Sequence, residues 1–79
     1  MALSRHQVDV LSNCLEDSEL SNLMSIVGRS DRTKFRHQVL NPLISAGLIA
    51  MTIPDKPRSS LQKYRITEKG RTWLTENNQ

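Results

Sequence analysis

Cysteine is nearly absent from this chain of 79 residues, and a single Cys14 excludes both an internal disulfide and a cysteine-based zinc site. Cys14 lies in an apolar pattern of helical period, which favours a core residue over a nucleophile. Aromatic residues are also scarce, with one Phe, one Tyr and one Trp. We expect Tyr64 and Trp73 to pack in the core, or Trp73 to stay half exposed and mark a dimer contact.

Long hydrophobic runs are missing as well. No apolar stretch could cross a bilayer, and polar residues 4–7 leave no room for a signal peptide after Met1, so we expect a cytoplasmic protein. His6 and His37 lie far apart and near no ligand cluster, so no metal site is expected. The sequence also lacks paired carboxylates, a nucleophile motif and a phosphate-binding glycine loop. It therefore predicts neither an enzyme nor a cofactor.

Positive charge is what the sequence has in excess, and the excess is confined to one part of the chain. The net charge is +3, but residues 1–28 carry a net −3 and residues 29–71 a net +7. Such asymmetry predicts a polyanionic partner for the second part. The alternative is a solvated surface whose charges segregate without a function.

Apolar periodicity predicts two helices in the first part of the chain. The first covers about residues 4–15 and opens on a capping box, in which Ser4 and Gln7 each accept a backbone N–H. The second covers about residues 18–27 and ends at Gly28, which favours a left-handed cap.

A third helix, at about residues 31–46, follows after a very short turn with Ser30 as its N-cap. Two helices so closely joined are typical of a helix-turn-helix motif. The apolar stripe of the third helix is too wide for one straight surface helix. Because proline lacks an N–H and disfavours helical geometry at the preceding residue, we expect a bend near residues 41–42, at Pro42.

The pattern changes after Gly47 and predicts a two-stranded β-hairpin at about residues 48–66. Its loop, residues 54–60, is rich in proline and charge, and the following strand alternates between apolar and basic residues. A last helix is expected at about residues 67–75, and residues 76–79 should form a frayed tail. This order defines an α+β winged helix-turn-helix fold, with residues 1–79 as one domain and residues 4–75 as its core.

Three segments resemble a known family: "GRSDRTKFRHQVLNPLISAGLI" (28–49), "TIPDKPRSSLQKYRIT" (52–67) and "ITEKG" (66–70). They are similar to the C-terminal winged-helix domain of bacterial Fic-type proteins and of transcriptional regulators related to the RecG helicase. The resemblance covers residues 20–74. Because the histidine- and Gly-Asn-Gly-containing motif of Fic enzymes is missing, the resemblance implies an accessory domain of a larger protein, or a stand-alone relative, and not the catalytic part.

Candidate DNA contacts come from the start of the third helix and from the hairpin, which would form the wing. A recognition helix reads the major groove with its N-terminal residues. The candidates are Arg29, Arg32, Thr33, Lys34, Arg36 and His37 around the helix, and Lys56, Arg58 and Lys63 on the wing. The alternatives are a solvated helix face and a hairpin whose charges and prolines prevent edge pairing. Arg36 could also lie along the protein with its stem packed.

The sequence therefore predicts a sequence-specific DNA-binding domain of a bacterial transcription regulator or Fic-type protein. Its expected partners are double-stranded DNA, a second copy of the chain and other domains of a parent protein, with no membrane. A competing hypothesis is a protein-interaction module that dimerises or docks on its parent. A third is an autoinhibitory tail of a larger enzyme.

Overall fold

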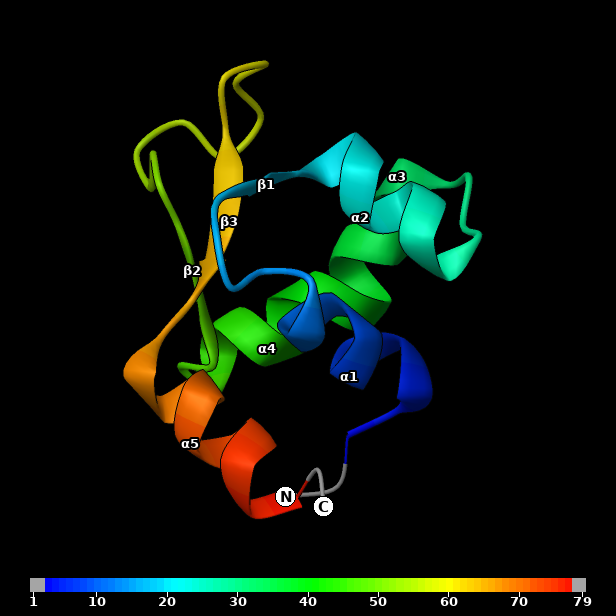
Figure 1. Ribbon diagram of the computed structural model, residues 1–79. Helices are drawn as coiled ribbons and strands as arrows, with labels where there is room; N and C mark the ends of the chain where they lie inside the picture. Colours follow the sequence, from blue (N-terminus) through cyan, green and yellow to red (C-terminus); the bar gives the residue numbers. More distant parts are fainter. Residues whose placement is uncertain (1–2, 78–79) are drawn as a thin grey trace.

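The computed structural model describes residues 3–77 and has the predicted α+β winged-helix architecture (Figure 1). The elements are α1 (Arg5–Ser12), β1 (Ser18–Glu19), α2 (Leu20–Val27), α3 (Arg32–Phe35), the π-helical segment η1 (Arg36–Leu40), α4 (Asn41–Ser45), β2 (Ile49–Met51), β3 (Lys63–Ile66) and α5 (Glu68–Asn77). Within residues 3–77, no helix is long and apolar enough to cross a membrane.

The sheet has three antiparallel strands in the order β1-β3-β2, and the predicted two-stranded hairpin is its larger part. The prediction of a helix over 18–27 is wrong at its first two residues, because Ser18 pairs with Tyr64 and Glu19 with Lys63. A strand of two residues carries no readable period. It exists because β3 offers it an unpaired edge.

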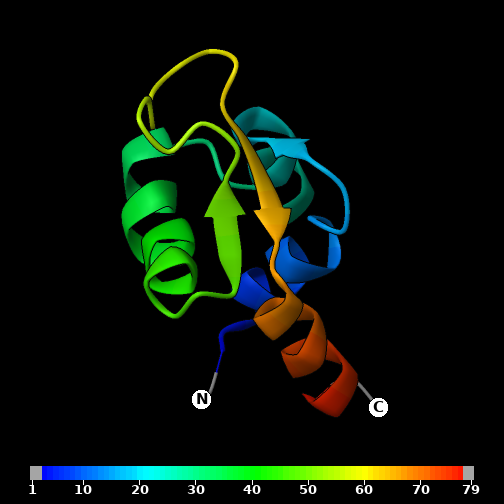
Figure 2. The ribbon, with the colours of Figure 1, turned by 90° about the vertical axis from the view of Figure 1, so that its left-hand side faces the viewer.

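Burial along β3 and the residues before it alternates as predicted. The buried residues are Gln62, Tyr64 and Ile66, and the exposed ones are Leu61, Lys63 and Arg65. Helix α4 packs beside β2, and α1 contacts both α2 and α5 (Figures 1 and 2). The core between these elements consists of Val10, Leu11, Cys14, Leu20, Leu23, Met24, Phe35, Val39, Leu40, Leu43, Leu48, Ile49, Tyr64 and Ile66. Trp73 is partly buried against it.

The third helix passes through residues 32–45 without a break, although its pattern predicts a bend near 41–42. Pro42 has no N–H for the carbonyl of Gln38, and its ring would collide with that carbonyl in a regular α-helix. The chain instead widens by one π turn, in which the N–H of Asn41 bonds to the carbonyl of Arg36. The backbone of Asn41 stays helical (φ −59°, ψ −42°).

The starts of the first and third helices follow the expected chemistry, with one correction. Ser4 and Gln7 form the predicted capping box. Asp31, and not Ser30, is the N-cap of α3, because its carboxylate accepts the N–H of Lys34 at 3.0 Å.

Glycines end the second and third helices as expected. Gly28 (φ 72°) and Gly47 (φ 77°) both adopt the left-handed conformation that favours glycine. The fourth helix runs beyond its predicted end, so Glu76 and Asn77 are helical and not part of a frayed tail. Residues 78–79 of that predicted tail lie outside the described residues.

Cys14 is fully buried, as predicted, and burial raises the pKa of its thiol to about 12. A thiol in the unfolded chain has a pKa of about 8.5 and ionises above that pH, whereas the buried thiol stays protonated. The free energy of unfolding should therefore be constant below that pH and fall by about 1.4 kcal/mol per pH unit above it. Between about pH 8 and pH 10, the free energy of unfolding of the wild-type domain should fall by about 2 kcal/mol more than that of the Cys14→Ala variant. Urea unfolding of both proteins at the two pH values measures this difference. Equal losses would contradict this assignment.

Candidate nucleic-acid interface

The first turns of the α3–η1 helix lie at the molecular surface. Phe35 is fully buried and anchors the helix to the core, which directs the opposite side of the helix towards solvent. Arg32, Thr33, Lys34 and His37 are all exposed. These predicted contact residues therefore form one accessible surface.

The loop over residues 54–60 is held in place from beneath by a buried glutamine. The Gln62 side chain accepts the N–H of Ile53 at 2.9 Å and donates to the carbonyls of Ile53 and Lys56. The amide thus takes the place of a strand pair where β2 and β3 have separated. It sets the position of a loop on which Lys56 and Arg58 are exposed.

A pocket of about 320 Å³ joins the helix to the loop. Arg32 and Arg36 line it from the helix, and Arg58 lines it from the loop. A second hollow, of about 190 Å³, also borders Arg36 and Arg58 and extends to His37. The helix and the loop therefore bring their basic side chains to a common groove, although more than twenty residues separate them in the sequence.

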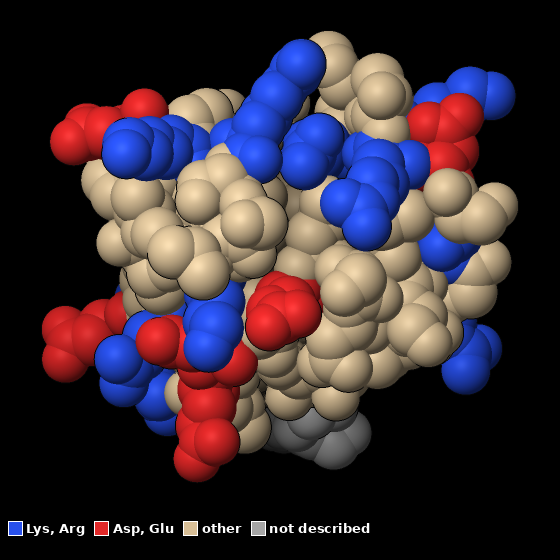
Figure 3. Space-filling view, turned by 90° about the horizontal axis from the view of Figure 1, so that it is seen from above, with Lys and Arg blue, Asp and Glu red and all other residues tan. Residues whose placement is uncertain are grey.

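Basic side chains gather on the face of the molecule that carries this groove. Figure 3 shows a row of Lys and Arg side chains across the face that carries the loop and the α2–α3 region, with acidic side chains at the ends of the row and one near the middle of the face. Glu19 is the acidic residue that lines the pocket. The interface candidate is therefore strongly basic but not uniformly so.

Arg36 lies partly buried between the helix and the loop, as the alternative interpretation of its sequence position allowed. Its Nε atom is buried and, among residues 3–77, has no hydrogen-bond partner. Arg36 borders both hollows together with Pro57, Arg58 and Tyr64.

Four of the nine predicted contact residues border the two hollows, namely Arg32, Arg36, His37 and Arg58, and Arg29 and Lys63 lie on other elements. Arg29 donates from Nη2 to Oε1 of Gln38 at 2.7 Å and borders a hollow near the start of α1. Lys63 sits on the exposed face of β3, opposite Glu19 of β1, and does not line the pocket. The other seven lie on the α3–η1 helix or the loop.

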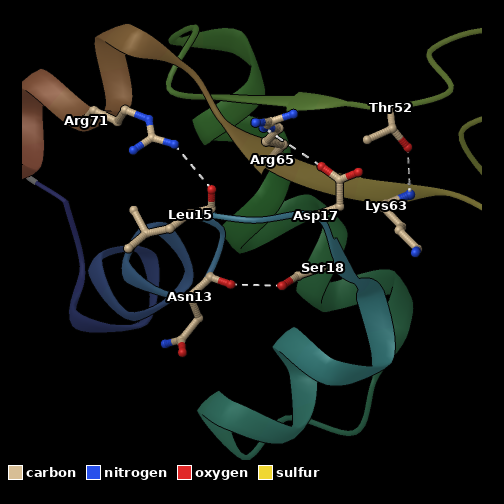
Figure 4. Close-up of polar contacts among 8 residues, drawn as sticks. All are labelled: Asn13, Leu15, Asp17, Ser18, Thr52, Lys63, Arg65 and Arg71. Carbon is tan, nitrogen blue, oxygen red and sulfur yellow. Dashed lines mark hydrogen bonds and ion pairs between the residues drawn. The ribbon is translucent and has the colours of Figure 1, made fainter.

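Further cations of the basic part stabilise the fold (Figure 4). Arg71 of α5 donates to the carbonyl of Leu15 at 3.2 Å, and Arg65 Nε lies 3.9 Å from Asp17 Oδ1. Both contacts attach the segment between α1 and β1 to the rest of the molecule. The exposed Arg65–Asp17 pair contributes little free energy, because solvent screens it.

Sequence reasoning did not place Glu19, Ser21, Gln62 and Tyr64 at this interface, although all four line the pocket. Only the pairing of β1 with β3 brings the first two there, and no local signal reveals that pairing. Within residues 3–77, no group of three or more His, Cys, Asp and Glu side chains could hold a metal ion.

Comparisons with known proteins agree with the resemblance to Fic-type proteins noted in the sequence. A family model described as "Filamentation induced by cAMP protein Fic-like, C-terminal domain" matches residues 6–67. The chain is also similar to the crystal structure of a Fic family protein from Desulfovibrio desulfuricans G20, with 32% identity and a TM-score of 0.72. That similarity covers 87% of this chain and 22% of the other, so the chain spans about a fifth of that protein. No curated protein matches the chain.

Proposed function

We propose, given that the chain belongs to the family of Fic-like C-terminal domains, that it is a non-catalytic module that binds double-stranded DNA. The module would belong to a longer bacterial Fic-type protein or transcription regulator and act in the cytoplasm. We also propose that it is related to the C-terminal winged-helix domains of the RecG-related regulators.

One observation carries the proposal: Arg32, from the start of the third helix, and Arg58, from the loop, line one pocket. A winged helix that binds DNA places its recognition helix in the major groove and its wing beside the adjacent backbone, so both must lie on one face. Lys34 and His37 extend this face along the helix, and Lys56 extends it along the loop. Arg and Lys are the side chains that most often contact phosphates and guanine edges.

Neutralising the helix cations should weaken duplex binding and reduce its dependence on salt. Each neutralised phosphate contact contributes about 0.9 to the slope of log affinity against log salt. We expect the double variant Arg32→Ala, Lys34→Ala to lower this slope by about 1.8 and the affinity by about tenfold. Fluorescence anisotropy of a labelled duplex pool at increasing NaCl measures both quantities.

The matched control is Arg65→Ala with Lys69→Ala, which removes the same charge from β3 and α5, away from the groove. We expect it to keep the wild-type slope. If both variants lose affinity equally, net charge and not this surface attracts the duplex. A wild-type domain that binds no duplex at low salt would overturn the proposal.

Docking on another domain or on a second copy is the competing function, and one feature favours it. Half-buried Trp73 lines a small hollow on α5 together with Leu48, Lys69, Thr72 and Glu76, at about 170 Å³. A partner at this face would not need the groove. In that case Arg32→Ala with Lys34→Ala would leave the function of the parent protein intact, which separates the two candidates.

A further inference from the structure

The pocket between the helix and the loop has the charge and donors of a concave anion site as well as of a duplex-binding surface. Three arginines line one space of about 320 Å³: Arg32 and Arg36 from one helix and Arg58 from the loop. Glu19 is the single acidic residue of its lining, so the lining carries a net charge of +2. Such a concave site attracts an anion with about two negative charges.

Arg36 supplies a donor that the protein itself does not satisfy. Its Nε is buried and has no hydrogen-bond partner among the described residues. A buried donor without a partner costs free energy, and such groups are rare in folded proteins. The Arg36 side chain also borders the pocket, and a planar guanidinium favours an oxyanion that accepts two bonds at once. A small turn of this side chain would bring Nε to such an oxyanion.

Further donors surround the same space. Ser21, Ser59 and Ser60 line the pocket and carry hydroxyl groups. The first turn of α2 also borders it, and the N-cap residue of that helix, Glu19, makes no side-chain capping hydrogen bond. Backbone N–H groups in such a turn lie at the positive end of the helix dipole.

We propose that this pocket binds a phosphate dianion, either free or as the terminal group of a small phosphomonoester. A terminal phosphoryl group has three free oxygens and a charge close to −2 at neutral pH, which matches the three arginines and the net charge of the lining. A phosphodiester of the nucleic-acid backbone has two free oxygens and one charge, so it matches this lining less well. The site therefore differs from a backbone contact in the ligand that it fits best, although Arg32 and Arg58 belong to both surfaces.

The Arg36 Nε–H resonance in a nitrogen–proton correlation spectrum of the whole chain tests the site without DNA. Sodium phosphate is added at constant ionic strength, with sodium chloride as the reference salt. We expect a saturable shift with phosphate and none with chloride. A nucleoside 5′-monophosphate is the second arm: tighter binding than phosphate identifies the phosphomonoester as the ligand, and equal or weaker binding identifies free phosphate.

Two comparisons can overturn the proposal. Dimethyl phosphate, a diester with one charge, should bind at least tenfold more weakly than phosphate, and equal affinity would refute a dianion site. Arg36→Lys keeps the charge but removes the planar donor, so the saturable shifts of the neighbouring backbone amides should disappear. Arg65→Lys makes the same change outside the pocket and should bind phosphate as the wild type does.

These measurements distinguish a loss of folding from a loss of phosphate binding, and phosphate binding from duplex binding. The backbone spectrum of Arg36→Lys reports whether the variant is folded before any ligand is added. Because no nucleic acid is present, a failure to bind phosphate says nothing against duplex binding. Conversely, a domain that binds no duplex can still show the phosphate-dependent shift.

Discussion

Replacing Gly70 with alanine should destabilise the domain by about 3 kcal/mol or more and lower its melting temperature by more than about 10 °C. A Cβ at position 70 would lie 2.2 Å from the carbonyl oxygen of Leu48 and 2.6 Å from Cγ1 of Ile66. Both distances are far below van der Waals contact. Helix α5 would have to move away from the sheet.

The crowded carbonyl has no room to yield, because hydrogen bonds hold Leu48 on both sides. Its carbonyl accepts the N–H of Thr67 at 3.0 Å, and its own N–H donates to the carbonyl of Leu43 at 2.9 Å. Moving Leu48 would therefore break the contact between the end of α4, the start of β2 and the start of α5. The loss is large because a domain of this size has only about 4–12 kcal/mol of stability in total.

Gly28→Ala is the matched control for the glycine prediction. Gly28 has positive φ, but no atom lies within 4 Å of the place that a Cβ would occupy, so alanine there adds backbone strain without a collision. We expect a cost of about 1–2 kcal/mol. Thermal and urea unfolding followed by circular dichroism would compare the variants. If Gly70→Ala costs no more than Gly28→Ala, the close approach of α5 to Leu48 is not what constrains this position.

The second large effect is expected at Gln62, because its side chain satisfies three backbone groups of the loop. Gln62→Ala would leave the N–H of Ile53 without its partner. It would also remove one hydrogen bond from each of the carbonyls of Ile53 and Lys56, which keep the N–H groups of Lys56 and Ser59 as partners. A buried group left without a partner costs about 1–3 kcal/mol and each further hydrogen bond lost about 1 kcal/mol, and water entering the opened loop would recover part of that cost. We expect a net loss of about 3 kcal/mol.

Hydrogen exchange separates this local effect from a general loss of stability. The amide of Ile53 should exchange much faster in Gln62→Ala than expected from global unfolding alone, whereas amides of α1 should follow global unfolding. Gln38→Ala is the control, because Gln38 is an exposed glutamine that bonds only to the Arg29 side chain. Unchanged protection of Ile53 would show that the loop is held by something other than this amide.

Helix periods, caps and the alternation before Thr67 predict most of the fold, because these features depend on neighbours a few residues away. Ser4 with Gln7 and the buried Tyr64 are examples in which the local pattern and the tertiary structure agree. Pro42 is a partial success. The sequence predicts that the helix must adapt to this proline, but it does not predict the π turn at Arg36–Leu40 by which the backbone does so.

The candidate site was likewise predictable from the sequence only in part. Its basic residue types and their two source segments can be read from the sequence, because charge does not depend on the fold. Sequence alone could not show that Arg58 shares a pocket with Arg32 while Arg29 bonds to Gln38 outside it. It also could not show that Gln62, an ordinary polar residue in the sequence, holds the loop from beneath.

By itself, the sequence determined that this chain forms a small helical domain with a basic wing. Periodicity, capping and net charge are local properties that each residue carries into any fold. Only the tertiary structure decided that β1 joins the sheet, that α5 requires a glycine against Leu48, and that three arginines line one pocket. These features depend on contacts between segments distant in the chain, whose geometry is set by packing of the whole core and not by any local pattern.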